Sequence, residues 1–218
     1  MRRWKKYVKE SLVAPAIEKD VIMPSNIYKP ALMKQLFELG CSYSAEMLSL
    51  TKTLGQLQDA GNVTTLSSYL EILNECNLLT GLQKYANDEA RRYQSVPKYQ
   101  VYNNALLTAY RGSTYEKDRT DTVVWGRWVE SAVGAYLLGS ADEGGYKVYY
   151  WHERSDEVDY IIVRQGEVVA LEVKSGRRGM NSGLPKFRER FNPKRDLVIG
   201  TDGIPFADFF NMKIEDLF

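Results

Sequence analysis

Residues 157–174 are the most informative part of the chain and read Glu-Val-Asp-Tyr-Ile-Ile-Val-Arg-Gln-Gly-Glu-Val-Val-Ala-Leu-Glu-Val-Lys. Two apolar runs rich in β-branched residues flank Gln165-Gly166. This pattern predicts two strands joined by a tight hairpin turn, in which the glycine supplies a positive φ. If Arg164 faces Glu167 across the turn, the turn fixes the register of the whole hairpin.

This register brings acidic residues together. It places Asp159 directly opposite Glu172, and the strand period of two puts Lys174 on the same face as Glu172. Two carboxylates that face each other on a sheet repel. A fold keeps them most readily when a cation lies between them or a lysine neutralises them. This order, with a carboxylate followed by a hairpin and then by Glu-x-Lys, is typical of a metal-dependent phosphodiesterase site.

The chemistry of phosphodiester hydrolysis assigns a role to each residue. Mg²⁺ or Mn²⁺ prefers hard oxygen ligands, which Asp159, Glu172 and the backbone carbonyl of Val173 would provide. Lys174 would act as the catalytic base or orient the attacking water and stabilise the transition state. Glu130 lies among apolar residues in a predicted helix, where a carboxylate is costly without a partner, so we expect it to be the fourth member of the site.

Each of these residues also has a structural interpretation. Asp159 and Lys174 could form a plain cross-strand ion pair, with Glu172 as a hydrogen-bonded edge carboxylate, and Glu130 could face solvent. Two further acids flank the predicted strand and are interpreted as turn residues: Asp156 and Glu157.

The composition excludes several classes of protein. The 218 residues are 44% hydrophobic and 12% aromatic, which is typical of a globular protein with one large or two small domains. His152 is the single histidine, so metal sites with two imidazoles are excluded. Cys41 and Cys76 lack a CxxC spacing and are expected to be buried thiols in a reducing compartment. No apolar run reaches 18 residues, so we expect no membrane partner and a cytoplasmic location.

The N-terminal half predicts a helical unit followed by a hairpin. The inner face of its longest predicted helix carries Leu66, Tyr69, Leu70 and Leu73. Short helix, turn, longer helix and hairpin match a winged helix-turn-helix. The predicted elements are a helix over 30–39 closed by Gly40, a helix over 51–58, a turn over 59–62, a helix over 63–76, and strands over 78–85 and 93–102.

Basic residues around this hairpin suggest phosphate contacts. Arg91 and Arg92 lie at its predicted tip and Lys98 on its second strand, so these side chains are candidates for nucleic-acid binding. Winged helices serve equally as protein-docking modules, so a docking role is the alternative.

The C-terminal half predicts a mixed α/β unit. Residues 103–120 are polar and are interpreted as the boundary between domains, which gives a winged-helix domain over 1–110 and a nuclease-like domain over 120–218. The fold class is therefore α+β. The predicted elements of the second domain are a helix over 122–138, strands over 146–153, 157–164 and 167–174, a helix over 185–191, and a strand over 197–200 that can pair in parallel.

A local charge excess follows the predicted metal ligands. Residues 174–195 contain eight basic residues and one acid, a net charge of +7 within a chain whose total is +1. A cationic rim beside an acidic, metal-loaded centre suits DNA entering a cleft, and a solvated basic helix face is the alternative. The candidate DNA-binding residues of this rim are Arg177, Arg178, Lys186, Arg188 and Arg190.

The set Asp159, Glu172, Val173 and Lys174 resembles the PD-(D/E)xK nuclease superfamily, with Val158 in place of its nominal proline. Six short motifs further resemble one uncharacterised family, the C-terminal region that follows an AAA-type ATPase domain in many bacterial and archaeal proteins. This resemblance implies a winged helix, then a restriction-endonuclease-like domain, with an ATPase domain as a partner. The motifs are residues 4–8, 17–21, 57–62, 95–99, 157–159 and 171–176.

The chain departs from such proteins because it has no Gly-x-x-x-x-Gly-Lys-Ser/Thr loop. No ATP site is therefore expected in it, and it would be either a fragment or a stand-alone relative. The expected function is a metal-dependent DNA phosphodiesterase associated with an ATPase. The alternative is a non-catalytic DNA- or protein-binding regulatory module of such an ATPase.

Overall fold

The computed structural model describes residues 2–23, 27–58, 61–88, 95–176 and 183–218. Its internal contacts divide the chain into two compact units, which we describe separately. The N-terminal unit comprises residues 1–81 and 96–118, and the C-terminal unit comprises 82–95 and 119–218. Both units combine helices with a β-sheet, so the expected α+β class is confirmed at this level.

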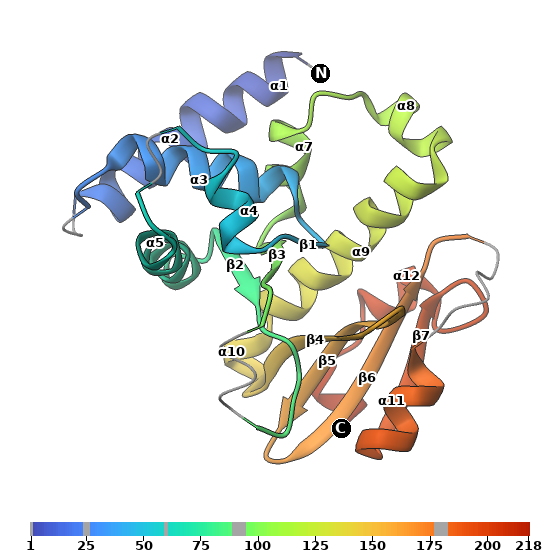
Figure 1. Ribbon diagram of the computed structural model, residues 1–218. Coiled ribbons are helices and arrows are strands. Elements are labelled where there is room, and N and C mark those ends of the chain that lie inside the picture. The colour runs from blue at the N-terminus through green and yellow to red at the C-terminus, as the bar shows by residue number, and fades with distance from the viewer. Residues whose placement is uncertain (1, 24–26, 59–60, 89–94, 177–182) are drawn as a thin grey trace. The chain divides into compact units, whose positions relative to one another are not determined.

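The N-terminal unit begins with a helical segment (Figure 1). Its geometry alternates between α and π. The face of α5 predicted to be internal, which carries Leu66 and Leu73, is buried, and Asn62 caps this helix by accepting the Thr65 N–H. The helices of the unit are α1 (Arg2–Tyr7), η1 (Val8–Val13), α2 (Ala14–Ala16), η2 (Ile17–Ile22), α3 (Pro30–Ser42), α4 (Leu50–Leu54), α5 (Val63–Glu75) and α7 (Asn104–Tyr110).

The sheet of the N-terminal unit has three short strands in the order β1-β3-β2. They are β1 (Glu46–Met47), β2 (Leu79–Leu82) and β3 (Lys98–Val101). The predicted strand over 78–85 is thus shorter, because the chain leaves this sheet after Leu82. Gln83 and Tyr85 already belong to the C-terminal unit, in which they form backbone hydrogen bonds with Tyr150.

Two expectations for the N-terminal half are corrected. Gly40 does not close α3, which continues to Ser42; it allows a close approach, because a Cβ at this position would clash with Leu79 and lie 3.1 Å from Tyr99. Residues 103–120 are not a plain polar linker. They form α7, whose Leu107 is fully buried, and α8 (Tyr115–Thr120).

The C-terminal unit contains the hairpin predicted from residues 157–174. Its four-stranded sheet has the order β4-β5-β6-β7, in which β4, β5 and β6 are antiparallel and β7 runs parallel to β6, as expected. The elements are α9 (Thr122–Gly139), α10 (Ala141–Gly144), β4 (Lys147–Glu153), β5 (Asp156–Arg164), β6 (Glu167–Lys174), α11 (Leu184–Phe191), β7 (Arg195–Gly200), α12 (Phe206–Phe209) and η3 (Ile214–Leu217).

Strand β5 contains an irregularity that the period of two does not predict. Tyr149 pairs with Ile161 and Trp151 pairs with Val158, so two steps along β4 correspond to three along β5. One extra residue of β5 therefore lies between Val158 and Ile161. Such a bulge explains why these two residues share one core cluster although they are three positions apart.

The same core cluster fixes α11 against the sheet. Phe187 is fully buried, and its ring centroid lies 5.5 Å from that of Trp151 and 5.7 Å from that of Tyr85. Tyr85 lies in this cluster, and the segment 82–95 to which it belongs groups with the C-terminal unit.

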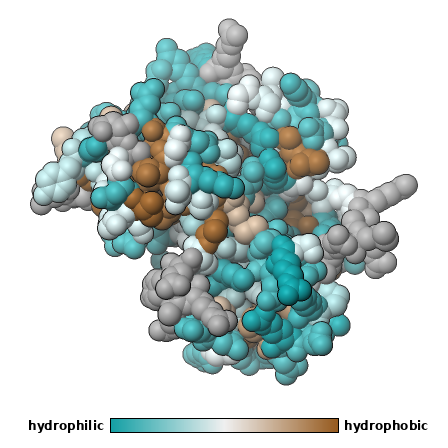
Figure 2. Space-filling model, viewed as in Figure 1, coloured by the Kyte–Doolittle hydropathy of each residue, from teal (hydrophilic) through white to brown (hydrophobic). Residues whose placement is uncertain are grey.

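Among the described residues on the face seen in Figure 2, hydrophobic side chains emerge in separate patches between hydrophilic ones. Across the described part of the chain, no helix is both long enough and apolar enough to cross a membrane.

Candidate metal site

The β5–β6 hairpin has the register expected from the sequence. Arg164 pairs with Glu167, and the ladder continues to Tyr160 opposite Leu171. Gln165 and Gly166 both have positive φ, 50° and 86°, as a two-residue hairpin turn requires. The next position along this register places Asp159 opposite Glu172.

Asp159 reaches across the hairpin to the opposite strand. Its Oδ2 accepts the backbone N–H of Val173 at 2.7 Å. This bond holds the carboxylate at the end of the β5–β6 ladder, beside the two residues of the Glu-x-Lys motif.

Glu172 is a buried acid with an incomplete set of partners. Its residue is 4% exposed, and Lys174 Nζ donates to its Oε1 at 2.5 Å. Its other oxygen, Oε2, is buried and has no hydrogen-bond partner among the described residues. Burial, followed by the negative charge of Asp159, raises the pKa of Glu172 to about 7.

Lys174 is held in its charged form. Burial lowers its pKa, but the hydrogen bond and charge of Glu172, with the charges of Asp159 and Glu130, outweigh burial and leave the pKa above its ordinary value. The lysine is therefore an ammonium at neutral pH.

A cluster of three carboxylates lies at the same end of the hairpin. Glu130, Glu157 and Asp159 each offer one oxygen, and these oxygens lie within 4.8 Å of one another. Glu130 comes from α9, where its backbone carbonyl accepts the Tyr160 hydroxyl at 2.8 Å. The structure thus brings Glu130 to Asp159 although 29 positions separate them in sequence.

Glu157 is a site residue that sequence reasoning missed. The interpretation of Asp156 and Glu157 as turn residues is wrong, because β5 begins at Asp156 and both residues pair with β4. The available signal was the i, i+2 spacing of Glu157 and Asp159, which places both on one face of a regular strand.

The donor set fits a hard divalent cation. Carboxylate oxygens dominate it, and His152 is the single histidine in the chain, so Mg²⁺ or Mn²⁺ suits it better than a metal that prefers nitrogen or sulfur. A buried carboxylate oxygen without a hydrogen bond is costly, and Glu172 Oε2 is such an atom. A bound cation would remove that cost.

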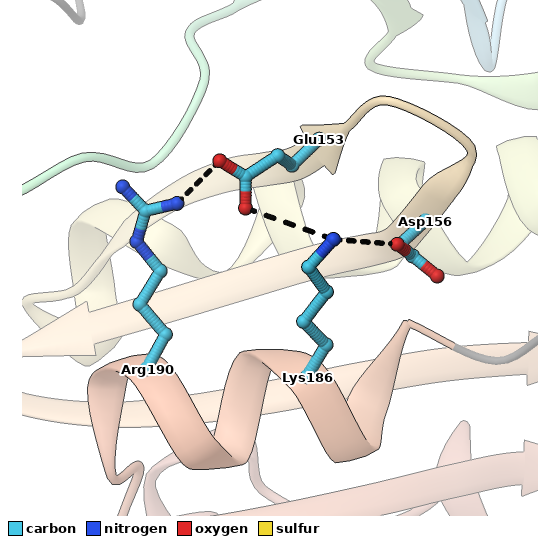
Figure 3. Close-up of polar contacts among 4 residues, drawn as sticks. All are labelled: Glu153, Asp156, Lys186 and Arg190. Carbon is cyan, nitrogen blue, oxygen red and sulfur yellow. Dashed lines mark hydrogen bonds and ion pairs between the residues drawn. The ribbon is translucent and has the colours of Figure 1, made fainter.

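The basic residues of α11 are paired with acids of their own unit. Lys186 Nζ lies 2.8 Å from Asp156 Oδ2 and 4.0 Å from Glu153 Oε2, and Arg190 lies 2.5 Å from Glu153 Oε1 (Figure 3). Arg188 forms an ion pair with Asp196. These three acids offset three of the seven positive charges counted along the sequence.

The other candidate DNA-binding residues have different outcomes. Lys98 is fully buried, so the prediction that it contacts a nucleic acid is wrong; it lies on β3, the central strand, where all four residues are buried. Four predicted contacts lie outside the described residues: Arg91, Arg92, Arg177 and Arg178.

Comparison with known proteins places the chain in an uncharacterised family. Residues 2–117, just over half of the chain, match a domain of unknown function (DUF8612), and the chain belongs to this family. Residues 125–211, which contain the acidic cluster and the hairpin, match a second domain of unknown function (DUF4143). No curated protein and no solved structure matches the chain.

Proposed function

We propose that the C-terminal unit is a metal-dependent phosphodiesterase that acts on DNA. The observation that carries this proposal is the buried Glu172 carboxylate, whose Oε2 has no hydrogen-bond partner among the described residues, beside a cluster of three further carboxylates and Lys174. A buried carboxylate next to three partly exposed ones destabilises a protein unless the charge has a use.

The order of elements supports a nuclease-like interpretation. In the C-terminal unit a helix precedes three antiparallel strands, then a second helix and a parallel strand follow. This order fits the restriction-endonuclease-like fold of PD-(D/E)xK nucleases. In the N-terminal unit α3, β1, α4, α5, β2 and β3 follow the order of a winged helix, which would serve as a binding module.

Each residue of the site would have its own role in hydrolysis. Glu130, Asp159 and Glu172 would hold Mg²⁺ or Mn²⁺, together with the Val173 carbonyl. The cation would neutralise charge on the phosphoryl oxygens and activate a water. Because its pKa is raised, Lys174 carries its proton and is a poor base for deprotonating that water. It is better suited to orienting the water and stabilising the transition state.

The experiment is a cleavage assay on labelled single- and double-stranded DNA with Mn²⁺, Mg²⁺ or EDTA. We expect metal-dependent cleavage by the wild type, and a loss of about 100-fold or more in Asp159→Asn and Lys174→Met. Asp208→Asn is the matched control, because Asp208 is an exposed acid on α12. Absence of cleavage by the wild type under every condition, or equal cleavage by Asp159→Asn, would refute the proposal.

A second candidate is favoured by the ion pairs of α11. Because Lys186, Arg188 and Arg190 are paired with acids, the chain could be a non-catalytic regulatory module that docks on an AAA-type ATPase domain. Salt dependence separates the two. A DNA-binding surface loses affinity with a log–log slope of about −0.9 per duplex phosphate contact. No measurable DNA affinity at low salt would favour the docking module.

A further inference from the structure

We propose that the outer face of α1 binds single-stranded DNA. This surface, the α1 face, comprises Arg3, Trp4, Lys6 and Tyr7. The inference rests on the proposed function for the identity of the ligand, DNA, and adds a binding surface in the N-terminal unit.

The exposure of two aromatic rings carries the first step. Trp4 is 41% exposed and Tyr7 is 55% exposed. Neither ring forms a hydrogen bond or a ring contact with another described residue. Side chains three positions apart on a helix are neighbours, with Cβ atoms about 5–6 Å apart. Trp4 and Tyr7 therefore offer two adjacent rings to a ligand.

Contacts on the opposite side of the helix determine which face points outward. Lys5 Nζ donates to the carbonyl oxygens of Arg111 and Ser113 at 2.6 and 2.9 Å. Val8 is buried, and Lys9 Nζ lies 4.4 Å from the centroid of an aromatic ring of α7. Positions 5, 8 and 9 share one side of a helix. At 3.6 residues per turn, positions 3 and 7 lie opposite to that side, and positions 4 and 6 flank them.

The charge of the α1 face suits a polyanion. Residues 2–9 contain five basic residues and no acid. Arg3 is exposed and has no ion-pair partner among the described residues. Lys6 forms one exposed pair with Glu10 at 3.8 Å, and such a pair is weak enough for a phosphate to replace it. Proteins that bind single strands combine cations, which contact phosphates, with aromatic rings, on which bases stack.

Other anionic partners fit the α1 face less well. The bases of a duplex stack on one another, so the two rings would reach them only after unpairing. A helix that lies on a membrane needs an exposed apolar face, and the apolar face of this helical segment is buried in its own unit. An acidic peptide would use the cations and leave the rings without a role. The buried apolar residues are Val8, Val13, Ile17 and Val21.

The test measures binding of the full chain to a labelled oligothymidylate of about 15 nucleotides by fluorescence anisotropy. EDTA is present, so that binding is measured without cleavage. Trp4→Ala and Tyr7→Ala should each weaken binding about 10-fold, whereas Trp4→Phe keeps a stacking ring and should stay within about 3-fold of the wild type. Combining Arg3→Gln with Lys6→Gln should flatten the log–log salt slope by roughly 1.4, because each single-strand phosphate contact contributes about 0.7.

Two matched controls separate the α1 face from surface substitutions in general. Tyr28→Ala removes an aromatic ring that is 93% exposed, and Lys52→Gln removes an exposed cation of α4. Both residues belong to the N-terminal unit and lie outside the α1 face. Both variants should bind the oligothymidylate as tightly as the wild type.

The outcomes separate this inference from the function on which it rests. If the wild type does not bind the oligothymidylate at low salt, or if Trp4→Ala and Tyr7→Ala bind it equally well, the α1 face is refuted, whatever the cleavage assay shows. If these variants lose affinity and the wild type cleaves no DNA, the α1 face stands and the phosphodiesterase fails. Should Trp4→Ala not fold, the salt slope of the combined Arg3→Gln and Lys6→Gln variant decides.

A membrane surface is tested with the same variants. The probe is a vesicle of phosphatidylcholine and phosphatidylserine in equal parts, and binding is measured by sedimentation. If Trp4→Ala loses binding to these vesicles while its affinity for the oligothymidylate equals that of the wild type, a lipid surface is the ligand and the proposal is refuted.

Discussion

Replacing Glu172 with glutamine should stabilise the metal-free protein at alkaline pH. Glutamine has the shape of the protonated acid, and its oxygen can still accept the hydrogen bond of Lys174. It removes the negative charge that burial and Asp159 disfavour. A substitution at a proposed metal ligand would then raise stability while it abolishes the function, because the site is destabilised without its ligand.

The pKa of Glu172 gives the magnitude and the sign of the expected difference in stability between the wild type and Glu172→Gln. Folding raises this pKa from the ordinary value of 4.5 to about 7. A group with a raised pKa contributes its stabilisation fully below the lower value and loses it as pH rises through the upper one. From pH 5 to pH 8 the free energy of unfolding of the wild type should therefore fall by roughly 2–3 kcal/mol relative to that of Glu172→Gln.

The assay is urea unfolding of the full chain in EDTA at pH 5 and pH 8. Titrations that both proteins share cancel in the difference between them. Glu143→Gln is the control, because Glu143 is an exposed acid on α10 and its replacement should change stability equally at both pH values. Mn²⁺ should stabilise the wild type and not Glu172→Gln. Greater stability of the wild type at pH 8 without metal, or a pH-independent difference, would refute the reasoning.

Two further substitutions test how the fold positions the site. Gly183→Ala should destabilise the protein by about 1–3 kcal/mol, because its Cβ would lie 2.7 Å from the Glu157 carbonyl carbon; a melting temperature equal to the wild type would contradict this. Asp121→Ala should cost about 1 kcal/mol, since Asp121 Oδ1 accepts the N–H groups of Val123 and Val124 at the start of the helix that carries Glu130; an unchanged free energy of unfolding would show that this cap is not needed.

The β5–β6 hairpin could be predicted from the amino-acid sequence. The two-residue turn Gln165-Gly166, the register that pairs Arg164 with Glu167 and the parallel pairing of the last strand were all predicted and are all present. The turn and the register depend on rules that act over a few residues: the period of a strand, the φ of a turn residue, and the alternation of apolar and polar positions. The parallel pairing was predicted from the order of the elements instead. The helical period of 3.6 residues located the buried face of α5.

The exposure of the basic residues could not be predicted, because it depends on contacts between elements far apart in the chain. The count of charges along residues 174–195 suggested an open cationic rim, but Lys186 and Arg190 face acids at the ends of β4 and β5 (Figure 3). Lys98 was counted as exposed, and the sheet of its unit buries it completely. A side chain's exposure depends on what packs over it, and no local pattern contains that information.

The acidic site was likewise predicted only in part. The sequence supplied Asp159 opposite Glu172 and the neighbouring Lys174, because one hairpin fixes all three. It also predicted Glu130 as the fourth member of the site, because a carboxylate among apolar residues needs a partner, and it assigned Glu157 to a turn. The meeting of Glu130, Glu157 and Asp159 depends on the packing of α9 against the sheet, on the extra residue in β5 and on the contact of Gly183 with Glu157. These are long-range contacts, whose geometry arises only when the whole unit is assembled.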